Sequence, residues 1–225
     1  KRFKVAVQPG LPRFCGGLAG YFGYDTVRYI ESRLARHSLP DELGVPDIQL
    51  MLTEELAVID NVAGRIYLIV YADPSIAGSF EKGQARLQEL FACLSKPVSM
   101  PASLPSIKTE LIRKFKAEDF EKAVLKTKEY ILAGDCMQVV IGQRISKPFT
   151  DSPLALYRAL RSLNPSPYMY FYDFGDLQVV GSSPEILVRQ EKRDSRKIVT
   201  IRPLAGTRPR GTTPEEDERL AKELL

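Results

Sequence analysis

The sequence predicts an α+β fold in which mostly antiparallel sheets are flanked by helices. Runs rich in β-branched and aromatic residues are joined by short turns, which is the pattern of antiparallel strands. Between these runs lie segments whose apolar residues recur at helical spacing. With 225 residues and 44% hydrophobic content, the chain is long enough for one large core or two small ones.

The first part of the chain is predicted to hold strands and two helices. In residues 16–25, glycines alternate with apolar and aromatic residues, as in a strand whose backbone is closely approached by a neighbour. We expect a short helix over residues 27–34. The β-rich runs 48–60 and 65–71 are separated by Asn-Val-Ala-Gly and predict a hairpin, and residues 75–94 have helical spacing.

A linker is predicted over residues 96–106, where proline and serine are concentrated and every period breaks. We therefore expect residues 1–106 to form the remainder of one domain with its linker, and residues 107–225 to form part of a second. The chain begins with Lys1, and its last helical pattern is followed by neither glycine nor proline. We expect a piece to be missing on each side.

The second part is predicted to open with a helix over residues 117–132, closed by Gly134. A strand is expected over residues 136–146. Its period of two places Gln138 and Arg144 on one face, which either lines a polar cavity or belongs to an edge strand with a solvated face.

A further helix is predicted to begin at Ser152 and Pro153, followed by a hairpin over residues 168–181 and a strand over residues 184–190. The last of these strands carries Glu185. A lone strand carboxylate usually points to solvent, whereas one turned inward can act as a general acid.

The segment 201–211 combines three arginines with a Gly-Thr pair around a proline-bounded turn, a composition typical of anion binding. A helix follows, because Thr213 can cap it, Pro214 suits its first position and Glu216 completes a capping box. Its amino end adds a partial positive charge nearby. The alternative is an ordinary basic surface loop.

Composition excludes several classes of function. Thirty-two basic and 28 acidic residues give a net charge of +4 that is evenly spread, which argues against nucleic-acid binding. Three widely spaced cysteines and one histidine, His37, form no metal or amidotransferase pattern, and they fit a reduced cytoplasmic protein. No apolar run reaches the ~18 residues of a membrane span.

Several blocks of the chain resemble the chorismate-utilising enzymes. Residues 134–144, 164–189 and 201–221 are similar to consecutive blocks of that family, and residues 16–31 are similar to its amino-terminal domain. Within that family, the chain most resembles the branch of anthranilate synthase large subunits, called component I. The resemblance implies that the chain is part of the family's two-sheet fold.

The resemblance also implies an activity. Members of this branch are Mg²⁺-dependent lyases that convert chorismate and ammonia to anthranilate and pyruvate, in the first step of tryptophan biosynthesis. A partner amidotransferase subunit supplies the ammonia from glutamine. On this resemblance, Glu185 is the proton donor, and Gly206 and Thr207 contact chorismate. The family's metal-binding glutamates and histidine are expected after Leu225, so no metal ligand is assigned here and the 225 residues alone are expected to make no anthranilate.

Two positions discriminate within the family. Relatives that add water resemble a pattern with lysine where this chain has Gln138, and glutamine cannot serve as that base. Aminodeoxychorismate synthases resemble a pattern with a nucleophilic lysine where this chain has Ala205. Both residues favour direct amination at ring carbon 2. The alternative is an enzyme that stops at aminodeoxyisochorismate, or one of the aminodeoxychorismate synthase type.

Residues 164–169 resemble the family's tryptophan-binding segment, with Asn164, Pro167, Tyr168 and Met169 as the inhibitor contacts. Tryptophan is therefore the expected feedback inhibitor. The alternative is that these side chains are ordinary core. Two hypotheses of other classes stay open: a non-catalytic fragment that binds tryptophan or docks the amidotransferase, and a generic α/β protein with an anion-binding loop.

Overall fold

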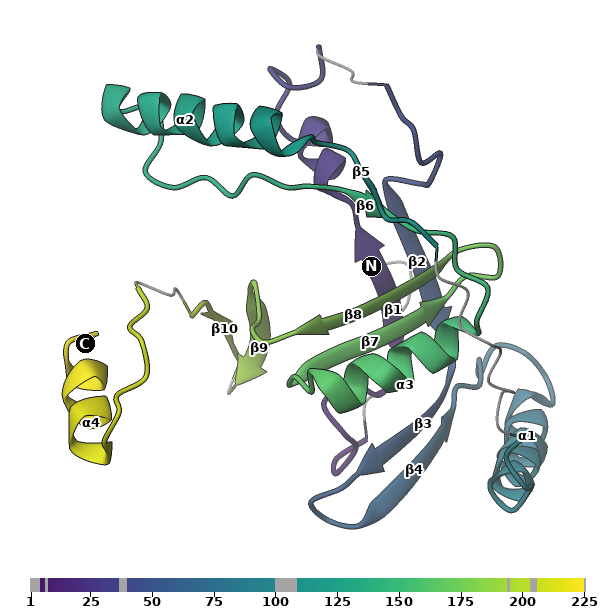
Figure 1. The fold of residues 1–225 in the computed structure, drawn as a ribbon. Helices are drawn as coiled ribbons and strands as arrows, with labels where there is room; N and C mark the ends of the chain where they lie inside the picture. The colour runs from purple at the N-terminus through teal and green to yellow at the C-terminus, as the bar shows by residue number, and fades with distance from the viewer. Residues whose placement is uncertain are drawn as a thin grey trace. The chain divides into compact units, whose positions relative to one another are not determined.

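The computed structural model describes residues 5–6, 8–36, 40–99, 109–193, 195–202 and 206–224. The chain divides into two compact units, Lys1–Met100 and Pro101–Leu225. Each unit combines helices with antiparallel strand pairs, which confirms the predicted α+β fold class (Figure 1). The two units are described separately.

The glycine-rich strand of the first unit is β1 (Gly17–Phe22), which pairs with β2 (Ile48–Thr53). The backbone carbonyl of Gln49 fills the space that a Cβ at Gly20 would take. The predicted close approach is thus confirmed. Between the two strands lies a 3-10 helix, η1 (Tyr24–Tyr29), which begins before the predicted range 27–34 because Gly23 already starts the turn by accepting a hydrogen bond from the Thr26 hydroxyl at 2.7 Å.

The predicted hairpin is formed by β3 (Glu55–Asp60) and β4 (Arg65–Val70). The Asp60 carboxylate shapes its turn by accepting hydrogen bonds from two backbone N–H groups at 2.9 and 3.0 Å. The predicted run 48–60 is therefore two strands, in two different pairs. The helix α1 (Ser79–Leu94) packs on β4, where a Cβ at Gly83 would lie 3.9 Å from the side chain of Val70.

The core of the first unit is small. Among the described residues, only Cys15 and Ile69 are buried. The Tyr71 hydroxyl donates a hydrogen bond to the Cys15 carbonyl at 2.7 Å, and its ring fills the space beside Gly16. The Tyr71 hydroxyl also lies 3.5 Å from the Cys15 thiol, and this side-chain hydrogen bond is the main cause that raises the pKa of Tyr71. It ties the start of β1 to the end of β4.

The second unit opens with a short pair, β5 (Ile112–Arg113) and β6 (Ile145–Ser146), and with α2 (Ala117–Ala133). The rings of Phe115 and Phe120 meet edge to face at 6.2 Å across the start of α2, as in a hydrophobic staple. The helix ends at Gly134, whose φ of 84° is left-handed. Both ends agree with the predicted helix.

The strand predicted over residues 136–146 is wrong except for β6. Residues 136–144 have no strand conformation, and the side chains of Met137 and Val140 are 96% and 86% exposed. A strand needs a neighbour for its backbone N–H and C=O groups. In the part of the chain that the structure describes, β5 is the only strand beside this segment, and it is two residues long.

A helix and a hairpin form the best-packed part of the second unit. The helix α3 (Pro153–Leu163) lies along β7 (Tyr168–Asp173) and β8 (Gln178–Ser183), with the rings of Tyr157 and Phe171 6.0 Å apart (Figure 1). Asp173 holds the turn by accepting a hydrogen bond from the N–H of Gly175 at 3.0 Å. The predicted hairpin is confirmed.

The strand predicted over residues 184–190 is wrong for residues 184–188, and only residues 189–190 are in strand conformation. Residues 184–188 form an irregular bend, because Pro184 cannot donate to a strand ladder and the Ser183 hydroxyl bonds the Glu185 carbonyl at 2.9 Å. The chain then forms a hairpin of β9 (Arg189–Arg193) and β10 (Arg196–Thr200). The last helix, α4 (Pro214–Lys222), begins as predicted, with the Thr213 hydroxyl accepting from the Glu216 N–H at 3.2 Å.

Candidate functional site

A pocket of about 320 Å³ lies at the end of the β7–β8 hairpin. Strand register explains its position, because Tyr168 pairs with Ser183 and so the chain before β7 lies beside the chain after β8. The described residues that line it are Pro167, Tyr168, Pro184, Glu185, Ile186 and Arg202.

The lining combines one carboxyl group, one guanidinium and one phenol ring with proline and isoleucine surface. Its volume lies at the low end of the roughly 300–1,000 Å³ of small-molecule sites. A guanidinium complements a ligand carboxylate, and the apolar walls suit a ring. The pocket can therefore hold a small cyclic carboxylic acid beside a group able to transfer a proton.

Glu185 lies in this pocket although the predicted strand around it does not form. The residue is half-buried, and the bond from the Ser183 hydroxyl to its carbonyl fixes the bend that turns it inward. The bend thus gives Glu185 the inward position that a regular solvent-facing strand would not.

The four predicted inhibitor residues are divided by the hairpin. Pro167 and Tyr168 line the pocket, whereas Met169 follows Tyr168 in β7 and so belongs to the opposite face of the strand, together with Phe171, which contacts α3. Asn164 ends α3, and its carbonyl accepts a hydrogen bond from the Ser182 hydroxyl at 2.8 Å. An occupant of the pocket would contact only two of the four directly.

Other predicted site residues lie elsewhere. Gln138 is exposed in the irregular segment after α2, and it does not line the pocket. Gly206 and Thr207 lie in the segment before α4 and are not among the described lining residues either. Ala205 and His37 are outside the described residues.

Arg202 is the pocket residue that sequence reasoning did not single out. It belongs to the arginine-rich segment 201–211, in which the resemblance indicates the Gly-Thr pair as the substrate contact. The sequence feature that could have identified Arg202 is its position directly after a strand pattern, two strands after Glu185 in the chain. The β9–β10 hairpin pairs Thr200 with Arg189 and so returns the chain toward the bend at Pro184, which brings the two side chains to one pocket.

The described residues do not fit a bound metal ion. Within them, no group of three or more His, Cys, Asp or Glu side chains is placed to hold one. None of the helices formed by the described residues is long and apolar enough to cross a membrane.

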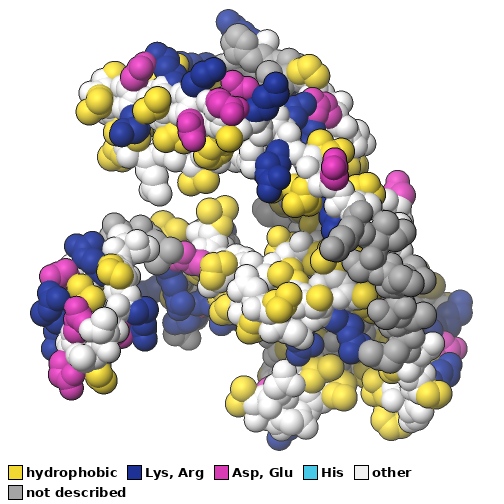
Figure 2. All heavy atoms as spheres, viewed as in Figure 1, with side chains coloured by type: hydrophobic (Ala, Val, Ile, Leu, Met, Phe, Trp, Pro, Cys, Tyr) yellow, Lys and Arg dark blue, Asp and Glu magenta, His cyan; other side chains and the backbone are white. Residues whose placement is uncertain are grey.

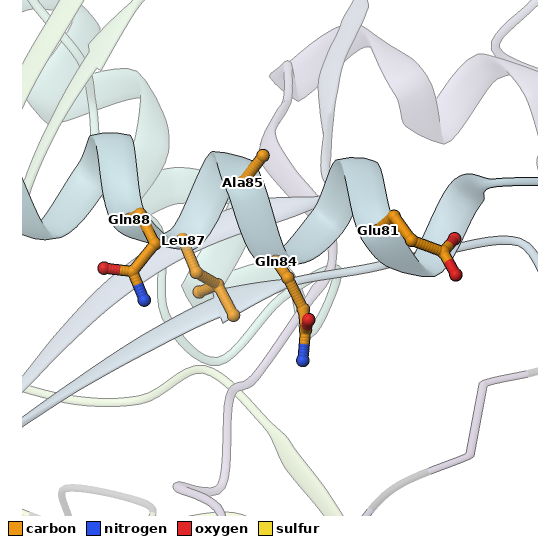
Figure 3. Close-up of a pocket in the computed structure, with 5 residues that line it drawn as sticks. All are labelled: Glu81, Gln84, Ala85, Leu87 and Gln88. Atoms are coloured by element: carbon orange, nitrogen blue, oxygen red, sulfur yellow. The ribbon is translucent and has the colours of Figure 1, made fainter.

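A second hollow, of about 420 Å³, lies along α1 and is lined by Glu81, Gln84, Ala85, Leu87 and Gln88 (Figure 3). All five belong to one helix. No second element among the described residues contributes to its lining, so it lacks the convergent walls of a ligand site.

Comparison with known proteins gives consistent results. Residues 2–225 match the family described as chorismate binding enzyme. The whole chain is 55% identical to anthranilate synthase component 1 of Neisseria meningitidis serogroup B and 54% identical to that of Pseudomonas putida, covering 45% and 46% of those proteins. The chain thus spans about half the length of these relatives.

A solved structure agrees with the sequence matches. Anthranilate synthase component I from Streptococcus pneumoniae superposes with a TM-score of 0.70 at 32% identity, over 85% of this chain and 43% of that one. The family match covers nearly every residue, including both predicted parts. The chain belongs to the chorismate binding enzyme family.

Proposed function

We propose that this chain is the chorismate-binding part of an anthranilate synthase large subunit, which converts chorismate and ammonia to anthranilate and pyruvate in the first step of tryptophan biosynthesis. The observation that carries the proposal is the pocket that joins Glu185 to Arg202 in a chain 53–55% identical to proteins with that name. Residues 1–106 would belong to the regulatory domain and residues 107–225 to the catalytic domain.

The proposed reaction requires one proton donor and several groups that bind the carboxylates of chorismate. Chorismate carries two carboxylates, which Arg202 and the Gly206 and Thr207 donors can bind. When ammonia adds at ring carbon 2, the 4-hydroxyl leaves with its bonding electrons, and a proton from Glu185 releases it as water. Elimination of the enolpyruvyl group as pyruvate, with loss of the proton on ring carbon 2, then makes the ring aromatic.

Residue identities favour ammonia over water as the nucleophile. Gln138 carries a neutral amide and cannot take a proton from water, as the lysine of water-adding relatives would. Ala205 has no amine to attack the ring. In this proposal Gln138 therefore acts as a hydrogen-bonding group and not as a base.

The proposal includes Mg²⁺, an amidotransferase subunit as partner and tryptophan as feedback inhibitor. The printed name component 1 of the relatives supports a second component. When bound, Mg²⁺ would hold a substrate carboxylate through hard oxygen contacts. Cys15, Cys93 and Cys136 are free thiols, which fit a reducing compartment. We therefore place the activity in the cytoplasm.

The test is a product assay on the full-length protein with chorismate, ammonium and Mg²⁺. We expect fluorescent anthranilate and pyruvate in equal amounts, loss of activity with a chelator, and use of glutamine only when the partner subunit is added. Aminodeoxyisochorismate or aminodeoxychorismate as the end product would contradict the proposed reaction. Unconsumed chorismate would favour a non-catalytic, tryptophan-binding or docking role.

The 225 residues by themselves are expected to form no anthranilate in the same assay. The reason is that their described residues contain no group fitted to a metal ion. Anthranilate made by these residues alone would contradict this part of the proposal.

A further inference from the structure

The segment before α4 is bound to that helix along its whole length. An added Cβ at Gly206 would lie 3.6 Å from the Leu224 side chain, near the carboxyl end of α4. At the other end, the Glu216 carboxylate accepts hydrogen bonds from the N–H and the hydroxyl of Thr212 at 2.8 and 2.5 Å. These bonds lower the pKa of Glu216, with the hydroxyl of Thr212 as the main cause.

Asp217 makes the central contact of this arrangement. Its Oδ1 accepts a hydrogen bond from the Gly211 N–H at 2.9 Å, and its Oδ2 lies 3.1 Å from the Arg210 guanidinium. An added Cβ at Gly211 would collide with the backbone of Asp217. The close approach of the two residues therefore requires glycine at position 211, and the hydrogen bond requires an acceptor at position 217.

The two contacts of Asp217 differ in strength. The Arg210 side chain is 91% exposed, so its ion pair contributes little. The bond from Gly211 is part-buried, and a charged acceptor makes it stronger than a neutral one. The backbone bond is therefore the stronger of the two restraints that Asp217 places on the segment.

The arginines of this segment face α4. Arg208 lies 3.1 Å from Glu223, just as Arg210 lies beside Asp217. Figure 2 shows basic and acidic side chains interspersed over this helix. Because helix carboxylates already bind these guanidinium groups, the anion-binding capacity of the segment rests on the backbone and hydroxyl donors of Gly206 and Thr207.

We propose that Asp217 is a positioning residue: by binding Gly211, it fixes residues 206–212 against α4 and so presents Gly206 and Thr207 to a carboxylate of the substrate. The inference rests on the proposed function. It adds a role for α4, which would hold the substrate-binding segment in place.

The experiment compares Asp217→Ala with the matched control Glu215→Ala in the full-length protein. Glu215 lies in the same first turn of α4 and is exposed. For Asp217→Ala we expect the KM for chorismate to rise about 10-fold, as loss of a charged hydrogen bond implies, with kcat changed less than about 2-fold. The control keeps wild-type values, and Asp217→Asn, which retains an acceptor for Gly211, restores most of the affinity.

Hydrogen exchange of residues 206–212 gives a readout that does not depend on activity. We expect faster exchange in Asp217→Ala than in the wild type and in the control. Unchanged exchange would contradict the restraint, and faster exchange with an unchanged KM would contradict the positioning role. A fall in kcat alone would indicate a merely structural residue. Wild-type protein that does not convert chorismate would overturn the proposed function, and the restraint would then be judged by exchange.

Discussion

The backbone carbonyl of Gln49 occupies the space in which a side chain at Gly20 would have to lie. Gly20 is in β1 and Gln49 in the neighbouring strand β2, so the two strands approach as closely as their backbones allow. Backbone atoms in a paired strand cannot move aside as the tip of a side chain can. The identity of residue 20 therefore decides whether these strands pair.

We predict that Gly20→Ala destabilises the first unit by about 1–3 kcal/mol, the usual cost of overpacking. The measurement is the urea midpoint of the full-length protein. The matched control is Gly83→Ala in α1, where the new Cβ would make ordinary contacts with Ala72 and Val70. Because alanine favours a helix over glycine, the control is expected to stabilise by about 0.5–1 kcal/mol. Equal midpoints for the two variants would contradict the prediction.

The ion pair between Glu55 and Arg86 predicts a pH effect on stability. The guanidinium binds both carboxylate oxygens at 2.9–3.1 Å and joins β3 to α1. The hydrogen bonds from Arg86 hold the pKa of Glu55 below its ordinary value of 4.5. Because the pKa of Glu55 is lower in the folded than in the unfolded protein, the ion pair contributes fully to stability above the unfolded-state pKa. This contribution is lost as the pH falls through the folded-state pKa.

On acidification from neutral pH to about pH 3, the wild type should therefore lose more stability than Glu55→Gln, which has no charge to lose at this position. The effect is expected to be small, since both side chains are over 40% exposed. Glu81→Gln, at an exposed position of α1, is the control and should follow the wild type. Parallel pH curves for Glu55→Gln and the wild type would exclude the pair as a source of pH dependence.

Replacing Glu185 tests the proposed proton donor. Glu185→Gln keeps the size of the side chain and removes the transferable proton, so kcat is expected to fall about 10²–10⁴-fold while the KM for chorismate changes little. Steady-state anthranilate formation is the measurement, and Asp176→Asn in the exposed β7–β8 turn is the control. Retention of kcat would assign proton donation to another group.

Replacing Pro167 tests the proposed tryptophan contact. Pro167 lines the pocket, whereas Pro165 in the same turn is not among its described lining residues. We expect Pro167→Ala to weaken tryptophan binding about 10-fold and Pro165→Ala to leave it nearly unchanged, as measured by calorimetry on the full-length protein. If both variants bind tryptophan like the wild type, the inhibitor does not use this pocket.

Where a local signal was strong, sequence reasoning agreed with the structure. The start and end of α2, the capped start of α4 and the β7–β8 hairpin follow from neighbouring residues such as Gly134, Thr213 and Asp173. The strand pattern of residues 136–144 was as clear, yet that segment stays irregular, because strand formation depends on a partner distant in sequence.

The candidate site shows the same division. The sequence by itself determined the family, the α+β class, the limits of α2, the start of α4 and the chemical types of Glu185, Gln138 and the Gly-Thr pair, since these depend on composition and on residues close in the chain. Only the tertiary structure placed Arg202 beside Glu185, separated Met169 from Tyr168 and bound Asp217 to Gly211. These relationships arise from strand register, from a bend at a proline and from the packing of a segment along a helix. The spacing of residues in the sequence therefore does not predict them.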